Sequence, residues 1–118
     1  PLITIGSHSV SHPRLSSLSD AQAAFELSES KRLLEEVVGK AVTFFSFPHG
    51  AYSERDLKFA EAAGYRRVFG IHPALAFACP KEFVTGRVAV DPRDSVIEFR
   101  LKLMGAYRWI SRNSQVIN

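Results

Sequence analysis

Hydrophobic and polar positions follow two different periods along the chain, and the changes of period mark the expected elements. Short runs rich in β-branched and aromatic residues predict four strands, at residues 2–5, 42–47, 67–71 and 87–90. Stretches with apolar residues every three or four positions predict three helices, from Ser19 to Gly39, from Ser53 to Gly64, and from Asp94 or Ser95 onward. Residues 74–86 are ambiguous: Pro80 and Gly86 favour a loop, and a brief extended piece within it is left open.

The first predicted helix has local start and stop signals. Ser19 is the expected N-cap, Gln22 completes a capping box with it, and Gly39 is the expected residue after the C-cap. Its apolar face comprises Ala23, Leu27, Leu34 and Val37. The other faces carry Glu26, Glu29, Arg32 and Glu36. This pattern predicts an amphipathic helix that serves as scaffold.

The last predicted helix has an apolar stripe along one face, made up of Val96, Phe99, Leu103, Tyr107 and Ile110. Residues 113–118 are expected to fray, as chain ends commonly do. The single cysteine, Cys79, has apolar neighbours and is expected to be a buried, inert thiol.

The predicted order of elements is β-α-β-α-β-β-α. This order favours an α/β fold with about four mainly parallel strands and three main helices outside the sheet. With 118 residues, of which 46% are hydrophobic and 23% charged, the chain has the composition of one globular domain or part of one. No apolar run has the length of a membrane span.

The formal net charge of +3 is concentrated near the C-terminus. Four cations lie there with no Asp or Glu after Glu98, at Arg100, Lys102, Arg108 and Arg112. Cations spread along a helix are typical of a solvated face, and neither an aromatic platform nor a glycine-rich phosphate loop accompanies them. The sequence therefore argues against nucleic-acid binding.

Histidines follow the predicted strands. His8 and His12 come after the first strand, His49 after the second and His72 after the third. In parallel α/β folds, ligands bind at the carboxyl ends of the strands, so these four side chains are expected on the functional edge. The simpler interpretation of a lone H-x-x-x-H pair is two loop histidines without a ligand.

The flanking residues indicate that His8 and His12 lie in a loop and not on one face of a helix. Pro13 disfavours helical geometry at His12, and serines alternate with the histidines at positions 7, 9 and 11. Serine hydroxyls in such a loop can fix the imidazole rings by hydrogen bonds, so both rings could converge on one cation.

Taken together, several motifs resemble the polysaccharide deacetylase family, whose members are metal-dependent esterases that act on N-acetylated glycans. The residues that carry the resemblance are Gly6 to Pro13, Leu18-Ser19, Glu26, Ser30, Lys31, Leu34, Gly39, Phe45 to Gly50, and Ala63-Gly64-Tyr65. The resemblance covers residues 3–71 well and the rest loosely. It implies part of a distorted (β/α) barrel, and a function in deacetylating a polysaccharide such as chitin, peptidoglycan or poly-N-acetylglucosamine.

The resemblance also implies roles for individual residues. His8 and His12 match the family's histidine pair, two of three protein ligands of zinc or a similar divalent metal. The segment Pro48-His49-Gly50 matches its Pro-aromatic-Gly turn, in which the backbone N–H of His49 would face the oxyanion of the reaction.

The chain departs from the family pattern in four places. The family's adjacent pair of aspartates, which supplies the base and the third metal ligand, has no counterpart, because the first carboxylate is Asp20. The arginine common two residues before the turn proline is replaced by Ser46, and the turn aromatic by His49. The late Leu-His motif that supplies the general acid is also missing. His72 or the side chain of His49 could replace it, although a solvated turn histidine is the simpler interpretation of each.

These departures lead to two expectations about the whole molecule. Residues 1–118 are expected to form a single partial deacetylase domain, inactive or impaired alone, whose N-terminal strands are missing. A homo-oligomer is expected to cover the sheet edge at residues 2–5, since exposed edges recruit partners.

Three readings remain open. A non-catalytic glycan-binding or assembly module on the same scaffold is the alternative to an enzyme, and an α/β interaction domain with coincidental histidines is the third possibility. Asp91 could orient a ligand or an acid, but an Asp-Pro turn explains it as well.

Overall fold

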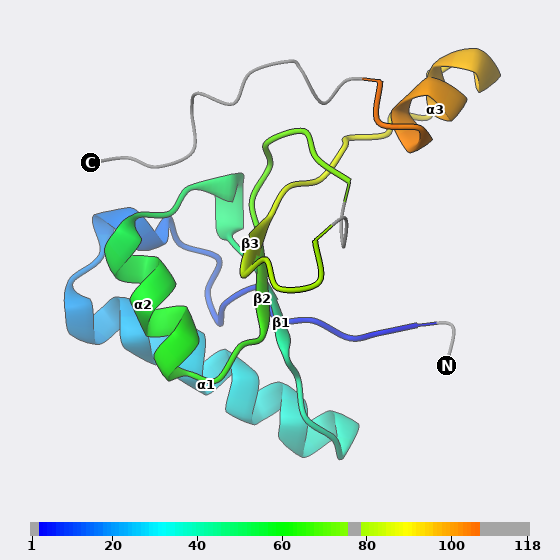
Figure 1. Ribbon diagram of the computed structural model, residues 1–118. Helices are drawn as coiled ribbons and strands as arrows, with labels where there is room; N and C mark the ends of the chain where they lie inside the picture. Colours follow the sequence, from blue (N-terminus) through cyan, green and yellow to red (C-terminus); the bar gives the residue numbers. More distant parts are fainter. Residues whose placement is uncertain (1–2, 76–78, 107–118) are drawn as a thin grey trace.

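The structure is a computed structural model that describes residues 3–75 and 79–106. Its elements, in chain order, are η1 (Leu15–Ser17), α1 (Asp20–Val38), β1 (Phe44–Ser46), η2 (Pro48–Gly50), α2 (Glu54–Ala62), β2 (Arg67–Phe69), β3 (Val84–Thr85) and α3 (Val96–Leu103). In Figure 1, α1 and α2 lie together on one side of the strands, whereas α3 lies apart from both. Among the described residues, no helix is both long enough and apolar enough to cross a membrane.

The sheet is parallel throughout, with the spatial order β1-β2-β3. The opening segment joins β1 on its other side through a single parallel bridge between Ser7 and Phe45. Two backbone hydrogen bonds fix this bridge, from Ser7 N to Phe44 O at 2.8 Å and from Ser46 N to Ser7 O at 2.9 Å. The opening segment, β1, β2 and β3 are therefore all parallel, and their carboxyl ends lie on the same side of the sheet. Parallel strands are what the sequence predicts.

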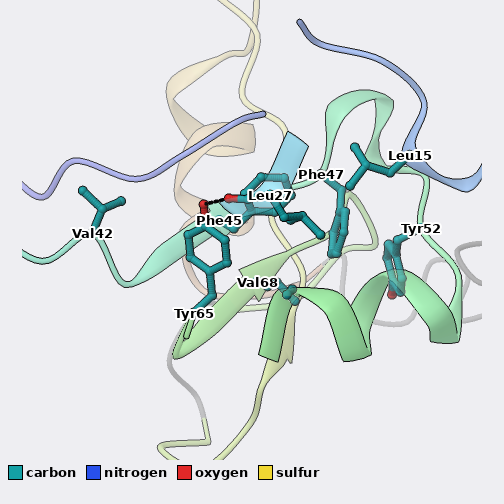
Figure 2. Packing of buried hydrophobic residues seen from close by; sticks show 9 residues of the cluster. Leu15, Leu27, Val42, Phe45, Phe47, Tyr52, Tyr65 and Val68 are labelled. Carbon is teal, nitrogen blue, oxygen red and sulfur yellow. Dashed lines mark hydrogen bonds between the residues drawn. The ribbon is translucent and has the colours of Figure 1, made fainter. Parts of the chain in front are cut away.

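The core lies between the sheet and the two packed helices (Figure 2). Leu27 of α1, Phe45 of β1 and Val68 of β2 are all completely buried. Tyr65 closes this cluster, and its hydroxyl donates a hydrogen bond of 2.9 Å to the backbone carbonyl of Leu27. Burying such side chains contributes about 1.5–3 kcal/mol each to the free energy of unfolding. This cluster therefore holds the sheet and the two helices together.

The helix starts agree with the sequence prediction. Ser19 and Ser53 each accept a hydrogen bond from the backbone N–H three residues on, and each forms a complete capping box. Ser95 caps α3 in the same way through Glu98 N. Caps depend on neighbouring residues only, which explains why sequence reasoning finds them.

Two strands differ from the prediction. Residues 3–6 form no strand, and Ile3 and Ile5 are 73% and 41% exposed, because Ser7 alone is paired with β1. The last strand, Val84–Thr85, is the brief extended piece left open within the predicted loop, whereas the strand predicted at residues 87–90 does not form. Gly86 is not a chain breaker here: a Cβ atom at that position would lie 2.0 Å from the carbonyl oxygen of His72, so glycine permits a close approach of two segments.

Two further expectations concern the second half of the chain. The predicted burial of Cys79 is wrong, because the residue is exposed and it is its backbone carbonyl that faces the protein, accepting a hydrogen bond of 2.8 Å from Arg67. In α3, Val96 and Leu103 of the predicted stripe are 71% and 60% exposed. The rest of that stripe from residue 107, and the predicted fraying of 113–118, lie outside the described residues.

Candidate functional site

The site begins where the opening segment leaves the sheet. Ser7, the paired residue before His8, is buried, and its hydroxyl donates a hydrogen bond of 2.8 Å to the hydroxyl of Ser30 on α1. The hydroxyl of Ser30 in turn donates to the carbonyl of Leu27 at 3.1 Å. These side-chain bonds tie the segment just before His8 to α1, and the backbone bonds of Ser7 with Phe44 and Ser46 tie it to β1.

The imidazole of His8 is held in one tautomer. Its Nδ1 lies 2.6 Å from the backbone carbonyl of Ser46, at the end of β1. A carbonyl oxygen can only accept, so Nδ1 carries the proton and donates it, and in the neutral form of the ring Nε2 has the lone pair. This is the arrangement that a histidine ligand requires when it binds a metal through Nε2.

Residues 8–13 form a tight loop with no helix, as the sequence predicts. Ser9 and His12 have φ values of 69° and 57°, in the left-handed region that residues other than glycine seldom adopt. The Ser9 hydroxyl accepts a hydrogen bond of 3.0 Å from His12 N, which stabilises the return of the chain. The loop therefore stores backbone strain that its surroundings must offset.

The side-chain carboxylate of Glu26, on α1, accepts hydrogen bonds from the same loop. Its Oε2 accepts hydrogen bonds from Val10 N at 2.7 Å and Ser11 N at 3.0 Å, and its Oε1 accepts one from the Ser11 hydroxyl. The residue is only 8% exposed. Burial raises its pKa, but the hydrogen bonds from the Ser11 hydroxyl and the two backbone N–H groups outweigh burial and leave the pKa below its usual value.

The turn after β1 carries His49. Its bonds run from Gly50 N to Phe47 O at 3.0 Å and from Ala51 N to Pro48 O at 3.2 Å, so the His49 N–H is not used to close the turn. His49 has φ 57° and Gly50 has φ 65°. A Cβ atom at Gly50 would lie 2.5 Å from two side-chain carbons of Ile71, which explains the glycine.

Three imidazoles lie in a row at this edge of the sheet. The ring centroids of His8 and His12 are 4.7 Å apart, and those of His12 and His49 are also 4.7 Å apart, both in edge-on geometry. His72 lies elsewhere, against Gly86, and its carbonyl accepts a hydrogen bond of 2.9 Å from Arg87 N. The structure thus brings together three of the four predicted histidines, and the two loops that hold them.

A pocket of about 370 Å³ adjoins His8 on the sheet side. Its lining includes Ser46, Phe69 and Arg87. The Ser46 hydroxyl is buried and has no hydrogen-bond partner among the described residues, and Arg87 Nε donates to the carbonyl of Gly70 at 3.0 Å. The pocket therefore has one unsatisfied hydroxyl and one cationic side chain beside the histidines.

The donor set fits a divalent metal in part. His8 and His12 supply imidazole nitrogens, the ligand type that zinc and similar ions favour. Within the described part of the chain, however, no group of three or more His, Cys, Asp or Glu side chains is arranged to hold a metal ion. The residues present would therefore hold such an ion by two imidazoles, with further ligands from elsewhere.

The sequence did not identify Glu26 as a site residue, and it left two interpretations of Asp91 open. Glu26 was assigned to a polar face of the helix, but it is buried against the loop between the two histidines. The one available signal was its position one turn before Ser30, on the side of α1 that also buries Leu27. Asp91 accepts a hydrogen bond of 2.9 Å from Arg93 N within its own turn, which favours the turn interpretation.

Solved structures with a similar fold include the Streptococcus pyogenes deacetylase PplD in complex with acetate, with a TM-score of 0.76 and 21% identity over 83% of this chain and 43% of that one. BC0361, a polysaccharide deacetylase from Bacillus cereus, gives a TM-score of 0.73 and 21% identity over 85% of this chain and 32% of that one. The predicted fold class, a mixed α/β chain forming part of the deacetylase barrel, is thereby confirmed.

The sequence has relatives as well. The Bacillus subtilis (strain 168) protein YxkH, whose name assigns it to the polysaccharide deacetylases, is 33% identical over 90 residues, which is 76% of this chain and 32% of that protein. The chain thus spans about a third of the length of this relative. Residues 2–68, more than half of the chain, match the polysaccharide deacetylase family. On this evidence the chain belongs to the polysaccharide deacetylase family.

Proposed function

We propose that this chain carries part of the active site of a metal-dependent N-deacetylase. The substrate class is an N-acetylated polysaccharide such as chitin, peptidoglycan or poly-N-acetylglucosamine. The observation that carries the proposal is the row of three imidazoles at the carboxyl ends of parallel strands, in a chain of this family. His8 and His12 are the proposed metal ligands, and the turn Pro48-His49-Gly50 is the proposed oxyanion site.

Each residue would have a distinct task. The Ser46 carbonyl holds the proton on Nδ1 of His8, so that Nε2 is free to bind zinc or a similar divalent ion. When bound, such an ion activates water and polarises the acetyl carbonyl. The His49 N–H, left out of the hydrogen bonds that close its turn, would donate to the oxygen on which negative charge develops, a contribution of about 3 kcal/mol in comparable sites.

The proposal leaves the base, the third metal ligand and the acid unassigned. No carboxylate joins the histidines in the described residues, and the chain spans about a third of the length of its relative YxkH. We therefore propose that the full activity belongs to a longer protein, and that the 118-residue chain alone has little or no deacetylase turnover. Acetate release from N-acetylglucosamine oligomers by the purified chain tests this point.

Zinc titration by calorimetry tests the proposed ligands. Replacing either histidine, in His8→Ala or His12→Ala, should weaken zinc binding at least about tenfold, which corresponds to roughly 1.4 kcal/mol. His72→Ala is the matched control, because His72 lies against Gly86 and outside the row of rings. Equal zinc affinity in the parent chain and in His12→Ala would show that the proposed pair is not the metal site.

A non-catalytic glycan-binding module is the second candidate, and it is favoured by the finding that, in the described ranges, no carboxylate completes a three-ligand metal group with the histidines. The two functions differ in their dependence on metal. Binding of N-acetylglucosamine oligomers that is unchanged by a chelator, together with no acetate release in any longer form of the protein, would favour the binding module.

We further propose that a second copy of the chain covers the edge formed by the opening segment. Ile3 and Ile5 are exposed there beside β1, although only Ser7 pairs with that strand. An unpaired apolar edge is a common site of strand addition. Light scattering at micromolar concentration should give a dimer or larger assembly that Ile5→Lys disrupts, and a monomer in the parent chain would contradict this proposal.

A further inference from the structure

We propose that Glu26 is the positioning residue of the histidine loop: its buried carboxylate fixes the segment between His8 and His12 and thereby sets the spacing of the two imidazoles. The consequence for metal binding rests on the function proposed above, whereas the effect on the loop itself does not. Glu26 acts through the loop and has no assigned contact with a substrate or a metal.

Three hydrogen-bond donors of the loop contact the carboxylate of Glu26. The two backbone N–H groups of Val10 and Ser11 are consecutive, and both point at the same carboxylate oxygen. The Ser11 hydroxyl donates to the other oxygen. All three donors lie midway between the two histidines, so one side chain on α1 determines where the middle of the loop lies. Hydrogen bonds to a charged acceptor are about twice as strong as neutral ones.

The carboxylate itself is held by a rigid base. On α1, the residues three positions before and one position after Glu26, Ala23 and Leu27, are completely buried. Leu27 belongs to the core cluster between the sheet and the helices, and its carbonyl accepts the hydrogen bond from Tyr65. The helix cannot move away from the loop without breaking this core, so the position of Glu26 is fixed by contacts other than those with the loop.

The loop needs such an external support. Ser9 and His12 have positive φ values, and a backbone with two non-glycine residues in the left-handed region persists only where its surroundings hold it. Within the loop, the bond from His12 N to the Ser9 hydroxyl supports the second half. Glu26 supports the centre, at Val10 and Ser11.

Because the three donors around Glu26 are neutral N–H and O–H groups, two variants can separate the geometry of this side chain from its charge. In Glu26→Gln, the amide oxygen can accept from both backbone N–H groups, while the amide NH₂ donates to the Ser11 hydroxyl, which can accept as well as donate. Glu26→Gln therefore keeps the geometry and removes the charge, whereas Glu26→Ala removes both. Glu29→Ala is the matched control, because Glu29 lies on the same helix and pairs with Arg32 at the surface.

The first measurement is made on the metal-free 118-residue chain by ¹⁵N NMR. In Glu26→Ala, the amide protons of Val10 and Ser11 should exchange about tenfold faster and move upfield, while the amide of Val68 in the core is unchanged. Glu26→Gln should stay within about threefold of the parent chain, and Glu29→Ala should match it. If Glu26→Ala does not fold, Ser11→Ala, which removes only the hydroxyl donor, is compared with Glu26→Gln in the same way.

The second measurement is zinc affinity by calorimetry on the same variants. Glu26→Ala should bind zinc about 10–100-fold more weakly, and Glu26→Gln should restore most of that loss, because residues that orient metal ligands typically have effects of this size. Equal weakening in the Gln and Ala variants would mean that the charge acts on the metal directly, and unchanged amide exchange in Glu26→Ala would mean that the loop holds itself. Either result overturns the inference. A parent chain that binds no zinc contradicts the proposed function alone, since the amide exchange measurement still decides the role of Glu26.

Discussion

Helices α1 and α3 begin with the same local signals but end in opposite environments. Each has a serine N-cap, Ser19 for α1 and Ser95 for α3, and each has an acidic residue in its first turn. Helix α1 buries a face that includes Leu27 and Glu26, whereas α3 has no buried residue along its whole length. The difference shows that local sequence specifies a helix, while packing decides whether the helix contributes to a core and a site.

The buried face of α1 is partly polar, and this is what links the helix to function. Ser30 accepts the hydrogen bond from Ser7 just before His8, and Glu26 binds the loop just after it. The exposed face of α3 includes Ile97 and Leu103, at 73% and 60% exposure. Its charged pair, Asp94 and Lys102, with N–O distances of 2.7 Å, links residues of one short segment only.

The largest expected effect comes from one matched substitution in the two helices. Leu27→Ala should lower the free energy of unfolding by about 2–5 kcal/mol, because Leu27 is completely buried in the core. Leu103→Ala should change it by less than about 0.5 kcal/mol, because that side chain is 60% exposed. Urea denaturation followed by circular dichroism measures both values. Equal losses in the two variants would mean that α3 is packed in solution.

A second pair of variants compares the open end of α1 with the turn of the site. Gly39 and Gly50 have nearly the same φ, 69° and 65°. A Cβ atom at Gly39 would meet no atom of the described residues within 4 Å, whereas at Gly50 it would lie 2.5 Å from Ile71. Gly39→Ala should cost about 1–2 kcal/mol for the left-handed backbone alone. Gly50→Ala should cost about 1–3 kcal/mol more, since overpacking is added to the same strain.

Chemical denaturation of the two glycine variants gives the difference, and NMR of the His12 and His49 rings shows where it arises. Only Gly50→Ala should shift the ring signals, because the turn sets the contact between them. The double variant Gly50→Ala with Ile71→Ala should recover the overpacking part. A loss in Gly50→Ala no larger than in Gly39→Ala would show that the turn is not tightly packed.

The sequence predicts the features of this fold that depend on neighbours along the chain. The predicted capping box at Ser19 and the predicted helix start at Ser53 depend on residues at most three positions apart, and both are found. The histidine edge is also predictable, because the order of strands and helices places His8 and His49 after parallel segments that must end on the same side. Motifs that resemble the family then identify the residues, which composition alone would not.

What the sequence could not give depends on contacts between distant segments. Gly86 lies outside the strands, as predicted, but the sequence does not show that it allows the close approach of His72, fourteen positions earlier in the chain. Glu26 was placed on a polar face because a carboxylate is seldom buried, and only the folded loop reveals three donors around it. Periodicity also predicts a buried stripe on α3, although burial requires a surface that the described residues do not supply.

A smaller effect is expected from removing the two N-caps. Ser19→Ala should lower the free energy of unfolding by about 1 kcal/mol, because α1 belongs to the cooperative core. Ser95→Ala should loosen α3 without changing the unfolding midpoint of the core, since α3 buries none of its residues. Urea denaturation measures the first effect, and amide exchange in α3 measures the second. An equal loss in the free energy of unfolding in both variants would mean that the two helices unfold as one cooperative unit.

The smallest effect is the acid sensitivity of one carboxylate near each helix. In Glu26, burial raises the pKa, but hydrogen bonds from Ser11 and Val10 lower it more, to below the ordinary value of 4.5. In Asp94, the hydrogen bond from Lys102 is the main cause of a pKa below the ordinary value of 3.8. Because both pKa values are depressed in the folded state, both carboxylates stabilise it fully above their ordinary values and lose this effect as pH falls through the folded values.

The two losses should have different consequences in an NMR titration. Below pH 4.5, protonation of Glu26 should speed amide exchange at Val10 and Ser11, and this response should be absent in Glu26→Gln. Protonation of Asp94 below its ordinary value should affect the amides of α3 alone. If the loop amides lost protection at a pH where the Glu26 carboxylate was still ionised, the loop would depend on another group, and the contrast between a helix that supports a site and one that does not would weaken.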